Sequence, residues 1–138
     1  MTIASTTHKF TIALRKGADE TVLLESVAVA ALRLGFRASE EDAESMSFLA
    51  FIDADGNAHD YISALSLIVM KGKASELRQF RSAAAERGVH VTNGKLAAQE
   101  DARGSTPATL QHSDFQTVIV FGAKEVVNPM TSKMSLWR

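Results

Sequence analysis

The sequence predicts a single α/β domain in which strands alternate with helices. Short apolar runs bounded by turn residues alternate with longer segments whose apolar residues recur at helical spacing. The chain has 138 residues, which is enough for one domain to bury a core without disulfides. We therefore expect one layered α/β domain over residues 1–138, with residues 1–7 flexible at its start.

Two helices and four main strands follow from these patterns. A first helix is predicted from residue 20 to residue 34, ending at Gly35, and a second over residues 74–87, ending at Gly88. The segment over residues 65–91 is typical of a βαβ unit with a right-handed crossover. The four main strands are expected at residues 9–14, 65–70, 89–91 and 117–121.

Two further elements complete the prediction. Asp and Gly residues at 53–56 are typical of a turn, so we expect a β-hairpin near residues 48–62. A helical turn over residues 122–127 should follow the last strand and end at Asn128-Pro129, because proline disfavours a helical conformation at the residue before it.

The first helix has apolar residues on more than one face. One stripe at helical spacing predicts the buried face, and the opposite arc is only partly polar. The stripe is Leu23, Val27, Ala30 and Leu34; the opposite arc holds Glu25, Ser26, Arg33, Val22, Val29 and Leu32. We expect Val22, Val29 and Leu32 to be covered, either by a loop of this chain or by a second copy in a homodimer.

The composition is that of a soluble globular protein, with 46% hydrophobic and 22% charged residues. A net charge of −1 gives no bulk attraction to nucleic acid or to a membrane, so neither partner is expected. The longest apolar run, residues 27–32, is too short to cross a bilayer. The absence of cysteine excludes thiol chemistry and suits a reducing compartment, so we expect a cytoplasmic location.

The C-terminal tail is unusually apolar. Met134, Leu136 and Trp137 lie within the last five residues, and Trp137 is the single tryptophan of the chain. Large apolar side chains near a terminus predict that the terminus packs onto the core. We expect Trp137 to seal an edge of that core.

Several motifs resemble a family catalogued as domain-of-unknown-function family 2000. The tail over residues 126–138 (VVNPMTSKMSLWR) resembles its closing segment, and residues 53–59 (DADGNAH) resemble its Asp-x-x-Gly-x-x-His turn. Residues 29–35 resemble its apolar first helix ending in glycine, and residues 67–71 resemble the strand of its central βα pair. The resemblance covers nearly the whole chain.

The resemblance implies a fold similar to the type-II peptidyl-tRNA hydrolases. That fold has three layers, α/β/α, around a four-stranded mixed sheet whose last strand is antiparallel, so the hairpin near residues 48–62 would be an addition. Those hydrolases carry a lysine where the first helix starts and an aspartate in an Asp-Ala-Gly turn after the third strand. Here residues 19–21 are Asp-Glu-Thr and residues 92–94 are Thr-Asn-Gly, so neither is matched in place. Lys16 is the weak candidate for the lysine.

The other weak catalytic candidate is His59. It lies beside Asp60 and across the predicted turn from Asp53, so a carboxylate could orient it as a general base. A solvated loop histidine is the alternative. Residues 53–56 also resemble the opening of a calcium loop, but Gly56 comes at the fourth position and not the sixth, so no metal and no cofactor are expected.

A ligand pocket is expected at the carboxyl edge of the sheet, where α/β proteins commonly bind ligands. Gly17 follows the first strand and Asn93 follows the third, so the two meet at one edge if these strands are parallel. Asn128 in the tail is the third candidate for ligand binding. We expect the protein to bind a small molecule or a protein partner there. The alternatives are a hydrolase related to peptidyl-tRNA hydrolase, and an interaction module or homodimer that uses the first helix.

Overall fold

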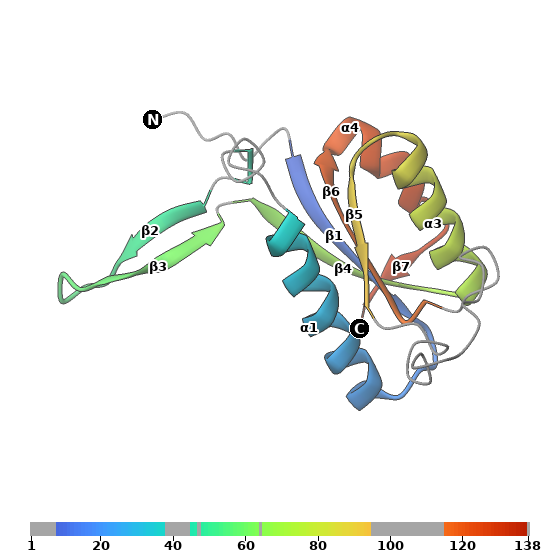
Figure 1. Ribbon diagram of the computed structural model, residues 1–138, viewed down its shortest axis with the longest axis horizontal. Helices are drawn as coiled ribbons and strands as arrows, with labels where there is room; N and C mark the ends of the chain where they lie inside the picture. Colours follow the sequence, from blue (N-terminus) through green and yellow to red (C-terminus); the bar gives the residue numbers. More distant parts are fainter. Residues whose placement is uncertain (1–7, 38–44, 47, 64, 95–114, 138) are drawn as a thin grey trace.

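The fold is a mixed five-stranded sheet with helices packed on it and a separate β-hairpin (Figure 1). A computed structural model describes residues 8–37, 45–46, 48–63, 65–94 and 115–137. The expectation for residues 1–7 lies outside these residues. The strands of the larger sheet lie in the order β5-β6-β1-β4-β7. They are β1 (His8–Arg15), β4 (Ser66–Gly72), β5 (His90–Asn93), β6 (Thr117–Ala123) and β7 (Ser135–Leu136).

The central strand β1 pairs with a parallel neighbour on one side and an antiparallel neighbour on the other. It runs parallel to β4, with Lys9 opposite Ser66 and Arg15 opposite Gly72. It runs antiparallel to β6, and β5 is antiparallel to β6 as well. β1, β4 and β5 therefore point the same way, and their carboxyl ends lie at one edge of the sheet. This confirms the sequence-based condition for Gly17 and Asn93 to share an edge.

Two apolar clusters lie on opposite faces of this sheet, because successive side chains of a strand point to opposite sides. The first joins β1 and β6 to α3 (Ala74–Glu86) and α4 (Lys124–Val127); its buried members are Ala13, Leu77, Phe80, Ala84, Phe115, Val118, Val120 and Val127. The second joins the same two strands to α1 (Glu20–Arg37); its buried members are Phe10, Ala30, Leu34, Met46, Leu65, Ile119 and Phe121.

The two faces are covered to different extents. Helix α3 contacts β1, β4, β5 and β6, whereas α1 packs mainly on β5 and β6. On the α1 side, β4 therefore carries Leu67 with 57% of its surface exposed. The predicted helix over residues 74–87 is confirmed as α3, but the flanking strands β4 and β5 of the predicted βαβ unit are not neighbours, since β1 and β6 lie between them.

Helix α1 is longer than the sequence predicted and is rotated from the predicted face. It continues through Gly35 to Arg37, so the prediction that Gly35 ends it is wrong. Glycine permits the left-handed conformation that ends a helix but does not impose it. Ser26, placed on the outer arc by the sequence, is buried, while Val27 is only half-buried. Of the three apolar residues expected to be covered, Val22 and Leu32 are exposed and Val29 is half-buried.

The predicted hairpin is present as strands β2 (Phe48–Ile52) and β3 (Ala58–Ser63). They pair with each other as a separate two-stranded sheet. Figure 1 shows this hairpin projecting away from the five-stranded sheet. It is an addition to the main sheet, as the sequence indicated.

The C-terminal segment adds a fifth strand, so the prediction of a four-stranded sheet is wrong. After α4 the chain continues through a 3-10 helix, η4 (Asn128–Thr131), and does not stop at Asn128-Pro129 as predicted. Strand β7 then pairs antiparallel with β4, with Met70 opposite Leu136. A two-residue strand leaves too short a pattern to be predicted from sequence.

Candidate functional site

The carboxyl edge of the sheet is held together by backbone hydrogen bonds at the ends of three strands. The Arg15 amide donates to the Gln116 carbonyl at 3.0 Å, and the Gly94 amide donates to the Thr117 carbonyl at 3.2 Å. The Lys16 amide donates to the Gly72 carbonyl of β4 at 2.8 Å. The end of β1 and the segment after β5 are therefore both tied to the start of β6, and the turn after β1 is tied to the end of β4.

A cavity of about 280 Å³ lies beside the carboxyl end of β1, on the half-covered α1 side of the sheet. Its lining is apolar except for one carboxylate. The lining residues are Leu14, Glu20, Leu23, Leu24, Val27 and Trp137. We refer to this cavity as the tryptophan groove. A concave apolar site with few polar groups is the usual form of a small-molecule pocket.

One wall of the tryptophan groove is the first part of α1. Residues 20, 23, 24 and 27 recur at the spacing that places side chains on one helical face. Leu23 is buried, whereas Leu24 is 73% exposed, so the wall runs from the core to solvent. Leu14, the last apolar residue of β1, contributes from the sheet.

The opposite wall is Trp137, which β7 holds beside β4. The Trp137 amide donates to the Val69 carbonyl at 3.0 Å, which continues the β4–β7 pairing by one residue. The side chain is 38% exposed. The expectation that Trp137 seals an edge of the core is therefore wrong: backbone pairing holds the residue beside β4, and it borders the cavity.

Contacts with β5 fix the position of α1, and with it the first wall. The Thr92 hydroxyl donates to the Ala30 carbonyl at 2.9 Å, and the Arg33 guanidinium donates to the Asn93 carbonyl at 3.1 Å. Gly94 lies so close to α1 that a Cβ atom there would overlap the hydroxyl and carbonyl of Ser26. Glycine is therefore required at position 94, because only glycine permits this approach of strand and helix.

None of the three residues predicted for ligand binding is among the residues that line the groove. Gly17 adopts φ 83° in the turn after β1, a conformation that favours glycine. Asn93 ends β5, where its amide oxygen accepts from Arg81 at 3.4 Å and its amide nitrogen donates to the Gly94 carbonyl at 2.9 Å. Asn128 is exposed and follows the other end of β6, and its carbonyl accepts from Thr131. The ligand roles of these three residues stay predictions.

The described residues do not assemble the lysine–aspartate pair of the hydrolase alternative. Lys16 is exposed in the turn between β1 and α1. The side chains that bind Asn93 within the described part of the chain are Arg33 and Arg81, which are both cationic. A carboxylate at the position of Asn93 would be needed for that chemistry, and Asn93 is an amide.

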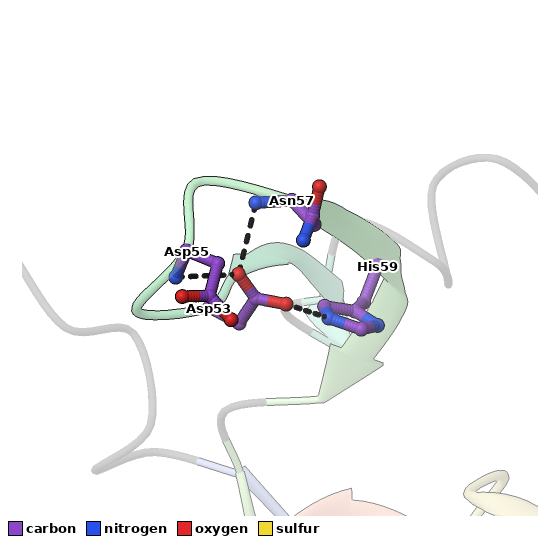
Figure 2. A network of polar contacts seen from close by, with 4 residues as sticks. All are labelled: Asp53, Asp55, Asn57 and His59. Carbon is purple, nitrogen blue, oxygen red and sulfur yellow. Dashed lines mark hydrogen bonds and ion pairs between the residues drawn. The ribbon is translucent and has the colours of Figure 1, made fainter.

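His59, the other catalytic candidate, forms a pair with Asp53 at the tip of the hairpin (Figure 2). The distance from His59 Nε2 to Asp53 Oδ2 is 2.8 Å, and Asp53 Oδ1 accepts from the amides of Asp55 and Asn57, each at 2.9 Å. The hydrogen bond to His59 and the two backbone hydrogen bonds hold the pKa of Asp53 below its usual value. His59 is therefore in contact with Asp53, and a catalytic role for His59 stays a prediction.

The geometry of this pair also favours the alternative interpretation of His59, that of a solvated loop histidine. His59 is 52% exposed, and the pair lies on the hairpin that projects from the main sheet. The tryptophan groove is lined by residues of β1, α1 and the C-terminal segment, and none comes from the hairpin. Asp53 therefore acts as a turn-forming carboxylate, whose oxygens satisfy backbone amides of the loop.

Lys9 is a buried cation that the sequence analysis did not single out. Its side chain is 6% exposed, and it lies on the α3 side of β1. Burial, with a smaller contribution from the charge of Lys124, lowers the pKa of its amine. Its position among the alternating residues of β1 was the signal that could have identified it, since residues 9, 11 and 13 share one face.

The arrangement defines an α/β protein with an apolar groove at the carboxyl edge of an open mixed sheet. The chain belongs to the family described as protein of unknown function (DUF2000), whose model matches residues 8–138. This confirms the family resemblance seen in the sequence.

A solved structure has a fold similar to that of this chain. The structure of a protein of unknown function from Agrobacterium tumefaciens is similar, with a TM-score of 0.73 and 16% sequence identity, over 95% of this chain and 98% of that one. At this identity the likeness concerns the fold alone. No protein with a curated description matches the chain. Within the described residues, no helix combines the length and the apolar character needed to cross a bilayer.

Proposed function

We propose that the protein binds a small, largely apolar molecule in the tryptophan groove. The observation that carries the proposal is the cavity of about 280 Å³ between α1 and Trp137, at the carboxyl edge of the sheet. Pockets for drug-sized ligands are about 300–1,000 Å³, so this volume fits a smaller molecule. The edge is the one where ligands commonly bind in α/β sheets.

The intrinsic fluorescence of Trp137 tests the proposal directly, because this residue is the single tryptophan and lines the groove. Titration with n-hexanol, a small neutral apolar probe, should change the emission in a saturable way. Leu24→Arg should weaken n-hexanol binding by about tenfold, since the new side chain occupies and charges one wall. Leu32→Arg is the matched control: Leu32 is 74% exposed and Leu24 73%, both on α1, but Leu32 is not in the lining. Equal binding by the wild type and Leu24→Arg would exclude the groove.

A second candidate function is association of two copies through α1. Leu32 and Phe36, at positions i and i+4 of the outer helical face, are 74% and 91% exposed. Exposed apolar side chains of this size, grouped on one face, are typical of interaction sites. Light scattering of the purified protein should then give twice the monomer mass, and Leu32→Arg should reduce it to the monomer mass. A monomer at high concentration would contradict this candidate.

We also propose that the fold is the three-layer fold of the type-II peptidyl-tRNA hydrolases. Strands β1, β4, β5 and β6 support it, since the last of them is antiparallel to the other three, and helices pack on both faces. A crystal structure superposed on a member of that class would test it.

A cytoplasmic location is proposed from the lack of cysteine, and fluorescence microscopy of a tagged protein would test it.

A further inference from the structure

We infer that the ligand of the tryptophan groove carries a cationic head group, such as an ammonium, on an apolar body. This inference rests on the proposed function and specifies its ligand class. It starts from the charge of the lining: Glu20 is the one charged residue among the six that line the cavity. Among the described residues of the wall, a ligand would therefore meet Glu20 and no lysine, arginine or histidine.

The position of Glu20 adds to this preference. Glu20 begins α1, where the aligned peptide dipoles contribute about half a positive charge. One full carboxylate exceeds that contribution, and the exposed Asp19 precedes it in the chain. Within the lining itself the charge is therefore negative, which attracts a cation and repels a carboxylate ligand.

Trp137 supplies a second, independent attraction for a cation from the opposite wall. The face of an indole ring attracts a ligand cation more strongly than the other aromatic side chains do. Leu14, Leu23 and Val27 provide the apolar surface for the rest of the molecule. The groove thus combines an apolar lining, one carboxylate and one indole, which is the combination that recognises an amphipathic amine.

Besides Lys16, which is exposed in the turn before α1, Lys71 is a basic residue on the same face that could oppose this preference. It pairs with Leu14 across β1 and β4 and with Ser135 of β7, so its backbone lies close to the groove. It is not among the lining residues. Lys71 is half-buried, so solvent screens its charge only in part.

Three probes with one chain length and three head groups test the inference: n-hexylammonium, n-hexanol and hexanoate, each titrated against the full chain with Trp137 emission as the readout. We expect n-hexylammonium to bind about three- to tenfold more tightly than n-hexanol, the scale of an exposed ion pair combined with a cation–π contact. Hexanoate should bind more weakly than n-hexanol.

Two variants separate the carboxylate from the groove itself. Glu20→Gln should reduce the preference for n-hexylammonium over n-hexanol at least about twofold, leaving the share that the cation–π contact with Trp137 supplies, and should leave n-hexanol unchanged. Glu125→Gln is the matched control, because it removes the first-turn glutamate of α4, outside the lining, and should change none of the three. Lys71→Gln should leave n-hexylammonium the tightest probe.

Each outcome bears on one of the two claims. If n-hexanol binds but n-hexylammonium binds no more tightly, or if hexanoate is the tightest, the cation preference is wrong and the groove stands. If none of the three probes changes the emission in a saturable way, the proposed function itself is wrong. Retention of the full, undiminished ammonium preference in Glu20→Gln would also overturn the assignment to Glu20.

Discussion

The two faces of the main sheet differ in how completely they are covered, and this difference locates the candidate site. On one face, α3 contacts four strands, and Leu77, Phe80 and Ala84 are at most 1% exposed. On the other, α1 packs mainly on two strands, and Leu24 and Leu67 remain more than half exposed. The buried side chains of the first face stabilise the fold. The second keeps apolar surface accessible between α1 and Trp137, where a ligand can replace solvent.

We call the face covered by α3 the closed face and the α1 side the open face. The largest expected effect on stability is on the closed face. Phe80→Ala should lower the free energy of unfolding by about 3–5 kcal/mol, because it leaves a cavity in the core cluster of α3. Leu24→Ala on the open face should change it by less than about 0.5 kcal/mol, since Leu24 is mostly solvated. Urea denaturation of both variants measures the contrast. Similar losses for the two would mean that the faces are covered alike.

Deletion of residues 134–138 should cost about 2 kcal/mol. Met134 packs against the α3-side cluster, and β7 contributes backbone hydrogen bonds to β4, but Leu136 and Trp137 remain partly exposed. Thermal unfolding of the truncated chain tests this value. An unchanged melting temperature would show that the tail does not stabilise the sheet edge.

Lys9→Met should stabilise the closed face by a few tenths to about 1 kcal/mol at neutral pH, because it removes a charge that burial disfavours. The pKa of Lys9 is lowered in the folded state, so the unfolded chain binds the proton more tightly. The cost of burying the charge is complete below the folded pKa, and it is relieved as the pH rises toward the ordinary value of 10.5. The advantage of Lys9→Met should therefore shrink between neutral pH and about pH 10.5 in thermal melts. A gain that does not depend on pH would indicate packing and not charge.

The smallest effect on global stability is expected at the hairpin, which belongs to neither face. Asp53→Ala removes the acceptor of the His59, Asp55 and Asn57 hydrogen bonds, so amide exchange at the turn should accelerate while the melting temperature stays unchanged. In the wild type, the lowered pKa of Asp53 means that its carboxylate stabilises the turn fully at pH values at and above the ordinary pKa of an aspartate. The turn should loosen as the pH falls through the lowered value. Exchange rates that do not respond to acid would contradict this role of Asp53.

Much of the fold could be predicted from the sequence because it is encoded in local patterns. The four core strands, the helix that ends before Gly88 and the hairpin around the turn at residue 56 each depend on residues close together in the chain. Helix α1 was predicted at its start but not at its end, because Gly35 continues the helix. The rotation of its buried face depends on a long-range contact, since Gly94 leaves room for Ser26.

The candidate site could be predicted only in its location. The carboxyl edge of the sheet followed from the general rule for ligand binding in α/β proteins. Leu14, Glu20 and Trp137, however, come from separate segments of the chain with no common motif. Both parts of the signal were visible in the sequence, as the excess of apolar residues on α1 and the single tryptophan of the tail. Only β7, which places Trp137 beside Val69, shows that they face one cavity.

The central claim is that the α1 side of the sheet is the binding face. Two-dimensional NMR of the labelled protein during titration with n-hexanol tests it most directly, because the indole N–H of Trp137 gives one resolvable signal. We predict saturable shifts of that signal and of the Leu24 and Val27 amides, with the Leu77 and Phe80 amides unmoved. Shifts confined to the α3 side, or none at Trp137, would contradict the account.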